Sequence, residues 1–261
     1  MIDQLAVIEP YITAFFLSLP RLIALFALIP FLGRTSLPGI VQTGVVMSFA
    51  LVIQPSVLGA LPSESLSAYS LIAIVLKEIF IGLMMGFAFV MLFHAIQAAG
   101  FFIDNQRGST MASSIDPMLG GQTSTTGLLL LQAFLAYFFA TGGFLAMLGV
   151  VYGSYEVMPV LSFVPQMPIS GAIFALEQLD RMVYLTFVLA APVVAAMLLA
   201  EVAVAFVSRF APQLNVFFIA MPIKCGVAFL VLILYVGTLV RHVDVASTPF
   251  ATLFEQIEGL M

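Results

Sequence analysis

The chain has 261 residues, of which 62% are hydrophobic and only 8% are charged, and its net charge is −5. A soluble domain carries about a quarter charged residues, so this composition excludes an ordinary soluble protein and predicts a membrane protein. The sequence has no basic run of the kind that would indicate a nucleic-acid partner. A single cysteine, Cys225, excludes a disulfide framework and is too little for a metal site. The first residues include no basic region and no small-residue cleavage site, so we expect no cleavable signal peptide.

Hydrophobic residues gather in six segments along the chain. A helix needs about 20 apolar residues to cross the hydrocarbon core of a bilayer, so the pattern predicts an all-α fold with about six long, partly broken helices. The segments are 11–32, 40–61, 69–103, 127–152, 182–208 and 214–240.

Several of these segments carry residues that a lipid-facing helix disfavours. Ionisable side chains at membrane depth are costly unless they face protein or water, so we expect these helices to pack against other protein more than against lipid. We expect the sixth segment to be interrupted at Pro222 and Lys224. Five positions are expected to lack partners within one chain: Pro20, Arg21, Glu201, Pro222 and Lys224.

A polar stretch, residues 104–126, separates the third and fourth apolar segments. It holds Asp104, Arg107, Asp116 and eight Ser/Thr hydroxyls. Irregular backbone survives at membrane depth only when it is buried in protein or lines water, so this loop is predicted to lie where water or a translocating substrate passes. Two interpretations of Asp104 and Arg107 stay open: a helix cap with a local ion pair, or a functional role.

The sequence contains no recognisable catalytic motif. His94 and His242 lie far apart without an HExxH spacing, and Ser109, Ser113 and Ser114 do not sit in a GxSxG turn. There is no Walker A sequence and no GxGxxG. We therefore expect no enzyme, no cofactor and no metal, and we interpret His94 as a satisfied interior or interface histidine.

The loop carries a resemblance to a known family. The stretch from Gly100 through Asp104-Asn-Gln-Arg-Gly to Pro117, with Gln122 and Ser124, resembles the central signature of the FliR/SctT family (SpaR, YscT, HrcT). These are the export-gate proteins of bacterial flagella and of type III secretion injectisomes. The residues at 104–108 are more similar to those of the injectisome branch. Three further places agree: Leu19-Pro20-Arg21, Lys77-Glu78 with Gly82 and Gly86, and Pro212 through Lys224.

The resemblance implies an architecture and partners. The whole chain, 1–261, would be one export-gate domain that joins FliP/SctR-like and FliQ/SctS-like subunits in a helical, cone-shaped pore. That pore would lie in the bacterial inner membrane, raised toward the periplasm. It would work with an FlhB/SctU-like switch protein and an FlhA/SctV-like export protein to pass unfolded secreted proteins. Residues 182–240 would form a hairpin like that of the FliQ/SctS partner, around Pro222-Ile223-Lys224.

The resemblance also implies roles for residues. The family's loop after the third apolar segment plugs the closed pore. The matching plug residues are Asp104, Asn105, Gln106, Arg107, Gly108, Ser109, Thr110, Met111, Asp116, Pro117, Gly120, Gly121 and Gln122. The residues expected in subunit contact and assembly are Arg21, Lys77, Glu78, Glu201, Asn215, Phe217, Phe218, Pro222 and Lys224.

Two alternatives stay open. The chain could serve a flagellar export gate instead of an injectisome. It could also be a secondary transporter, in which Glu201 and Lys224 form an ion or substrate site at the bilayer midplane.

Overall fold

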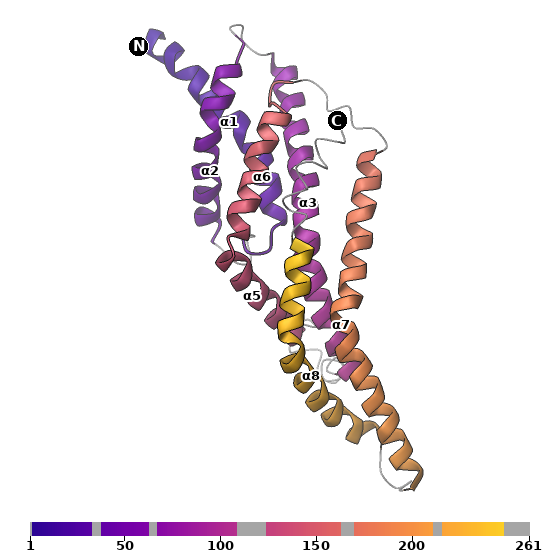
Figure 1. The fold of residues 1–261 in the computed structure, drawn as a ribbon. Helices are drawn as coiled ribbons and strands as arrows, with labels where there is room; N and C mark the ends of the chain where they lie inside the picture. The colour runs from indigo at the N-terminus through magenta and orange to yellow at the C-terminus, as the bar shows by residue number, and fades with distance from the viewer. Residues whose placement is uncertain are drawn as a thin grey trace. The chain divides into compact units, whose positions relative to one another are not determined.

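The computed structural model describes residues 2–32, 38–62, 67–108, 124–162, 170–210 and 216–247, and these contain only helices, turns and bends. The fold predicted from the sequence is therefore confirmed as all-helical (Figure 1). The helices are α1 (Ile2–Leu28), α2 (Gly39–Ala60), α3 (Ala68–Arg107), α5 (Thr125–Ala140), α6 (Gly143–Val157), α7 (Ser170–Phe210) and α8 (Val216–Ser247).

Five of the described helices are long and apolar enough to cross a membrane, and α5 with α6 form a sixth candidate span that is bent by 72°. The sequence pattern shows a single apolar segment over 127–152, so this bend is a difference from the prediction. It occurs at Gly142, whose φ of +79° lies in the left-handed region. Glycine adopts that region without a Cβ clash, which allows the chain to end α5 and begin α6 in a new direction.

Proline interrupts the helices less than the sequence predicts. α1 continues through Pro20, and α8 runs without interruption through Pro222 and Lys224. The predicted break of the sixth segment at Pro222 is therefore wrong, and so is the hairpin turn around Pro222-Ile223-Lys224. Proline removes only one backbone hydrogen bond, whereas ending a helix in apolar surroundings would expose many. The connection between α7 and α8, residues 211–215, lies outside the described residues.

The chain forms two compact units. Unit 1 comprises Met1–Met91, Gly142–Gln178 and Pro249–Met261, and unit 2 comprises Leu92–Thr141 and Leu179–Thr248. In unit 1, α1, α2, α6 and the first part of α3 run alongside one another (Figure 1). Their fully buried side chains include Leu22, Leu25, Phe26, Ala50, Met147 and Val151.

Unit 2 is built from the last part of α3, α5, most of α7, and α8. An aromatic group lies at the contact of α3 and α5: the ring of Phe93 lies 5.1 Å from that of Phe134 and 5.4 Å from that of Phe138. Tilted and edge-to-face rings at these distances pack favourably. Thr186 on α7 donates a hydrogen bond to the carbonyl of Ala95, which ties α7 to the same part of α3.

Glycine permits the closest helix approach in each unit. In unit 1, a Cβ on Gly82 would overlap the carbonyl oxygen of Arg21, so α3 lies directly against α1. In unit 2, a Cβ on Gly100 would lie 2.5 Å from the Cα of Gly127, so α5 begins directly against α3. Gly82 belongs to a GxxxG pattern, a sequence signal of close helix packing, and in this chain it serves packing within the unit.

Candidate functional site

A buried ion pair joins α1, α3 and α6 in unit 1. The Nε of Arg21 donates to Oε2 of Glu78 at 2.7 Å, and its Nη2 donates to Oε1 at 3.0 Å. Both side chains are fully buried. A bidentate pair of this kind supplies geometric specificity as well as energy, so it fixes the register of α1 against α3.

The remaining donors of Arg21 reach α6. Nη1 donates to the hydroxyl of Ser154 at 2.9 Å, and Nη2 donates to the carbonyl of Met158 at 2.8 Å. The guanidinium lies 4.0 Å from the centre of the Tyr155 ring, and the Tyr155 hydroxyl donates to the carbonyl of Ser18. The buried charge is therefore satisfied on several sides, as burial of a guanidinium requires.

Lys77 extends this cluster to the turn after α6. Its Nζ lies 3.0 Å from Oε1 of Glu78 and donates to the carbonyls of Pro159, Val160 and Ser162. The carbonyl groups that follow a helix carry partial negative charge, which favours a cation there. Lys77 and Arg21 together therefore neutralise the end of α6.

This arrangement corrects an expectation from the sequence. Arg21 was expected to lack a partner within one chain, but Glu78 pairs with it 57 residues away. The same expectation for Lys224 and Glu201 is also wrong, because Nζ of Lys224 lies 3.2 Å from Oε2 of Glu201. The Lys224 side chain is 11% exposed and that of Glu201 is 46% exposed, so this pair links α7 and α8 within unit 2 and leaves part of the carboxylate accessible.

The base of the polar loop is organised by Asp104. Its Oδ2 accepts hydrogen bonds from the hydroxyl of Ser124 at 2.7 Å and from the backbone N–H of Thr126 at 3.0 Å. Its Oδ1 lies 2.9 Å from Nη2 of Arg107. Ser124 in turn accepts from the N–H of Gly127 as the N-cap of α5. The carboxylate on α3 therefore caps α5, since the first N–H groups of a helix lack partners within it.

Arg107 connects the Asp104 group to α8. Its Nη1 lies 3.7 Å from the sulfur of Cys225, and its guanidinium lies 5.2 Å from the centre of the Phe229 ring. Of the two interpretations of Asp104 and Arg107, the helix cap with a local ion pair is confirmed. The helix that is capped is α5, on the far side of the loop.

The predicted plug residues divide into two groups. Asn105, Gln106 and Gly108 lie with Asp104 and Arg107 in the last turn of α3 or directly after it. Gly108 has a φ of +84°, which explains a glycine at the point where α3 ends. The other plug residues lie outside the described residues: Ser109, Thr110, Met111, Asp116, Pro117, Gly120, Gly121 and Gln122.

The predicted assembly residues also divide. Arg21, Lys77 and Glu78 form the buried cluster of unit 1, whereas Glu201 and Lys224 form the pair of unit 2. Pro222 lies inside α8, six residues after its first residue Val216. Asn215 and the side chains of Phe217 and Phe218 lie outside the described part of the chain.

Sequence reasoning missed several partners in these groups. Ser154 and Tyr155 complete the Arg21 cluster, and Phe229 packs on Arg107, yet none of them carries a local sequence signal. Ser124 could have been found, because a serine directly before an apolar run is a typical N-cap.

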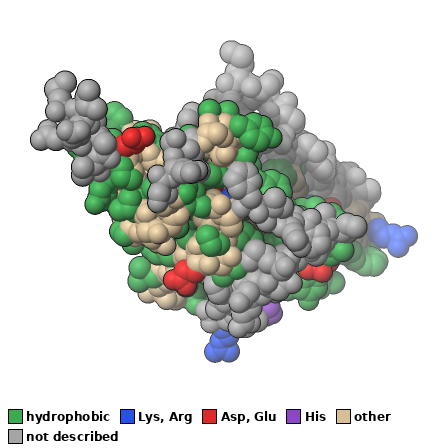
Figure 2. All heavy atoms as spheres, turned by 90° about the horizontal axis from the view of Figure 1, so that it is seen from above, with side chains coloured by type: hydrophobic (Ala, Val, Ile, Leu, Met, Phe, Trp, Pro, Cys, Tyr) green, Lys and Arg blue, Asp and Glu red, His purple; other side chains and the backbone are tan. Residues whose placement is uncertain are grey.

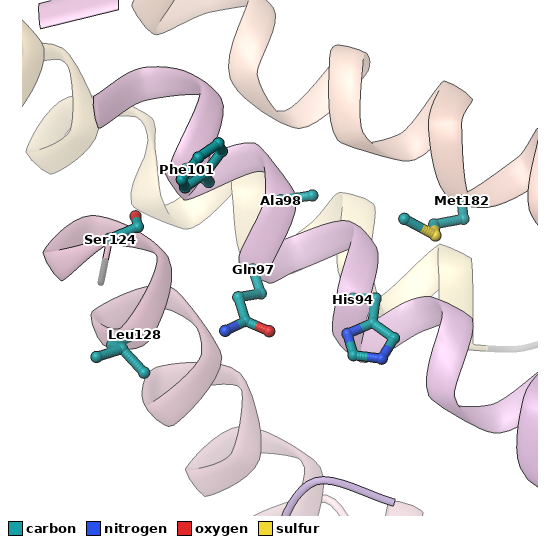
Figure 3. Close-up of a pocket in the computed structure, with 7 residues that line it drawn as sticks. All are labelled: His94, Gln97, Ala98, Phe101, Ser124, Leu128 and Met182. Carbon is teal, nitrogen blue, oxygen red and sulfur yellow. The ribbon is translucent and has the colours of Figure 1, made fainter. Parts of the chain in front are cut away.

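A shallow pocket of about 400 Å³ lies in unit 2 (Figure 3). His94, Gln97, Ala98 and Phe101 line it from α3, Ser124 and Leu128 line it from α5, and Met182 lines it from α7. His94 is exposed there, so it is not an interior residue of this chain, and its interpretation as an interface histidine stays a prediction. The Ser124 hydroxyl is committed to Asp104 and Gly127, which leaves no nucleophile beside a base among the described residues that line this pocket.

No three His, Cys, Asp or Glu side chains in the described ranges come together as metal ligands would. The described surface is instead strongly apolar. Figure 2 shows hydrophobic side chains spread over the face in view, with only scattered charged groups. Only 22% of the most apolar stretch of α7 and 11% of that of α8 are buried within the chain. These helices therefore present apolar surface to lipid or to other chains.

Comparisons with known proteins indicate the family of this chain. Residues 12–248 match the family described as bacterial export proteins, family 1. The Yop proteins translocation protein T of Yersinia pestis is 42% identical over 88% of both chains. The surface presentation of antigens protein SpaR of Salmonella typhimurium is 34% identical over 84% of this chain and 81% of its own length. The flagellar biosynthetic protein FliR of Bacillus subtilis is 31% identical over 95% of this chain and 94% of its own length.

The match covers nearly the whole chain, and the identities place it nearer to the Yersinia translocation protein than to the flagellar protein. The chain therefore belongs to the family of bacterial export proteins, family 1, which is the FliR/SctT family, and it resembles the injectisome branch of that family.

Proposed function

We propose that this protein is a subunit of a type III secretion export gate, which shapes and seals a channel for unfolded proteins in the bacterial inner membrane. The supporting observation is the length and exposure of its helices. α3 has 40 residues and α7 has 41, so at 1.5 Å per residue each rises about 60 Å. The hydrocarbon core of a bilayer is about 30 Å thick.

An apolar helix of twice that length cannot be covered by lipid alone. The parts of α7 and α8 that extend beyond the bilayer need other protein chains to cover their exposed apolar side chains. This need supports a hetero-oligomer with FliP/SctR-like and FliQ/SctS-like subunits, raised toward the periplasm. It also supports the further proposal that 182–240 acts as a partner-like hairpin.

The partners that energise and control export are proposed from the family relationship. They are an FlhB/SctU-like switch protein and an FlhA/SctV-like export protein, and the cargo is unfolded secreted protein. The subunit itself performs no reaction in this proposal. A midplane transport site at Glu201 and Lys224 finds no support in the names of the three relatives, which refer to translocation of Yop proteins, surface presentation of antigens and flagellar biosynthesis.

We further propose that residues 104–126 plug the resting channel. A channel wide enough for an unfolded chain would leak ions unless polar backbone and side chains filled it. The described base of this loop supports the assignment, because Asp104 joins the end of α3 to the start of α5. The ends of the loop are thereby held at a fixed place in unit 2.

Deletion of residues 110–121 tests this assignment while Asp104 and Arg107 remain. The complex should assemble, cells should become leaky to ions and small solutes, and secretion should continue or become deregulated. The amount of assembled complex, measured by its co-purified partners, is the control. Wild-type conductance with a normally assembled complex would refute the plug assignment.

A further inference from the structure

The junction of α3 with α5 contains a group of side chains whose contact with α8 the proposed function does not use. Asp104 is the centre of this group. One carboxylate oxygen accepts two hydrogen bonds from the start of α5, through Ser124 and Thr126, and the other lies 2.9 Å from Arg107. The same side chain therefore connects the cap of α5 to a cation in the last turn of α3.

Arg107 is held less completely than Arg21. Its charged partner is Asp104, and its other described contacts are the sulfur of Cys225 at 3.7 Å and the ring of Phe229 at 5.2 Å. Its Nε is buried and has no hydrogen-bond partner among the described residues. A largely buried guanidinium with one anionic partner depends heavily on that partner. Loss of the Asp104 charge would leave Arg107 poorly compensated.

The backbone around this pair is closely packed. Gly100 lies one turn before Asp104 on α3 and touches Gly127 of α5, so the two helices cannot approach further. Gly108 lies directly after Arg107, and a Cβ at that position would lie 3.3 Å from Cε of Met221 on α8. α3, α5 and α8 thus meet at the Asp104–Arg107 pair, and all three contacts lie within unit 2.

We propose that the Asp104–Arg107 pair is a latch that couples α8 to the start of α5 and so sets how firmly the channel is sealed. This inference rests on the proposed function, because it assigns a regulation to the same loop. Asp104 and Arg107 are positioning residues that fix Gly108 and Ser124, the two described residues beside the loop. A displacement of α8 that withdraws Phe229 from the guanidinium weakens the Asp104–Arg107 pair. Gly108 and Ser124, at the two ends of the loop, are then both held less firmly.

A mutant cycle in the assembled export complex tests the latch. Asp104→Asn keeps the acceptor for Ser124 and Thr126 but removes the charge that holds Arg107. Arg107→Gln removes the other half of the pair. Each single variant should raise ion leak through the resting complex roughly tenfold, the effect of about 1.4 kcal/mol in an equilibrium. The double variant should also give roughly tenfold, not a hundredfold, because both changes open the same latch.

Phe229→Leu tests the link to α8 separately. It keeps an apolar side chain but removes the ring beside Arg107, so it should raise the leak in the wild-type background and add little in the Arg107→Gln background. It also serves as the test if Asp104→Asn fails to assemble. Gln132→Ala, a change of an exposed polar residue elsewhere on α5, is the matched control and should leave the leak unchanged.

The outcomes separate the latch from the plug. If deletion of 110–121 leaks but Asp104→Asn, Arg107→Gln and Phe229→Leu all conduct like wild type in assembled complexes, the latch is wrong and the plug stands. If complexes with that deletion do not leak, the plug assignment is wrong, and the latch proposal, which rests on it, is wrong as well. Single effects that multiply in the double variant would also overturn the latch, since two independent structural roles would then explain them.

Discussion

Glu78→Gln provides the sharpest test of the buried cluster in unit 1. The substitution keeps the side-chain size but removes the carboxylate that faces both Arg21 and Lys77. Breaking a buried ion pair by removing one partner costs about 3–5 kcal/mol, because the other charge stays buried. Ser154 and the carbonyl of Met158 continue to hold Arg21, so we expect the lower end, about 3 kcal/mol.

A loss of that size lowers the ratio of folded to unfolded chain by roughly a hundredfold. The amount of chain in purified export complexes and the midpoint of their thermal dissociation should both fall. Lys77→Met is the matched control, because it leaves the bidentate Arg21–Glu78 pair in place, and its effect should be clearly smaller. The double variant Arg21→Met with Glu78→Leu should recover part of the loss, since no buried charge is left unpaired.

Two results would refute this reasoning. Glu78→Gln complexes that form in normal amounts and dissociate at the wild-type temperature would show that the cluster does not stabilise unit 1. A double variant whose loss equals the sum of the losses measured for Arg21→Met alone and Glu78→Leu alone would show that the two side chains act independently.

Three other predictions follow from the packing and the charges. Gly82→Ala should cost about 1–3 kcal/mol and reduce assembly, because its Cβ would overlap the carbonyl of Arg21, whereas Gly149→Ala should be tolerated because nothing lies within 4 Å of the added Cβ. Lys224→Ala should reduce secretion more than Lys224→Arg, which keeps a cation opposite Glu201, and equal secretion by both would argue against a role for the charge. Expression without the proposed partners should give degradation or aggregation, as followed by pulse-chase, because α7 and α8 expose too much apolar surface.

The sequence predicts the helices of this protein well, because apolar segments of span length have few alternatives to helix in a membrane. It misses the bend at Gly142 because hydropathy counts residues 127–152 as one apolar run, although the pair Gly142-Gly143 inside that run is a turn signal. It overstates the effect of Pro222, because a proline within an apolar helix costs one backbone hydrogen bond and leaves the helix continuous.

The side-chain partners are harder to predict from the sequence. Arg21 and Glu78 can each be recognised as ionisable residues that are costly to bury in an apolar segment. They lie 57 residues apart in the sequence, however, and their pairing depends on the tertiary packing of α1 against α3. Asp104 and Arg107 form a local pair that spacing alone allows. Their contacts with Thr126 and Phe229 require the return of the chain through α5 and α8, which no local pattern contains.

The central claim is that this chain works as one subunit of a hetero-oligomeric export gate. Affinity purification of the tagged chain from its native membrane in mild detergent tests that claim most directly. We expect two other small membrane proteins, of the FliP/SctR and FliQ/SctS types, to co-purify with it in a fixed ratio. A monodisperse, thermally robust monomer or homo-oligomer would contradict it.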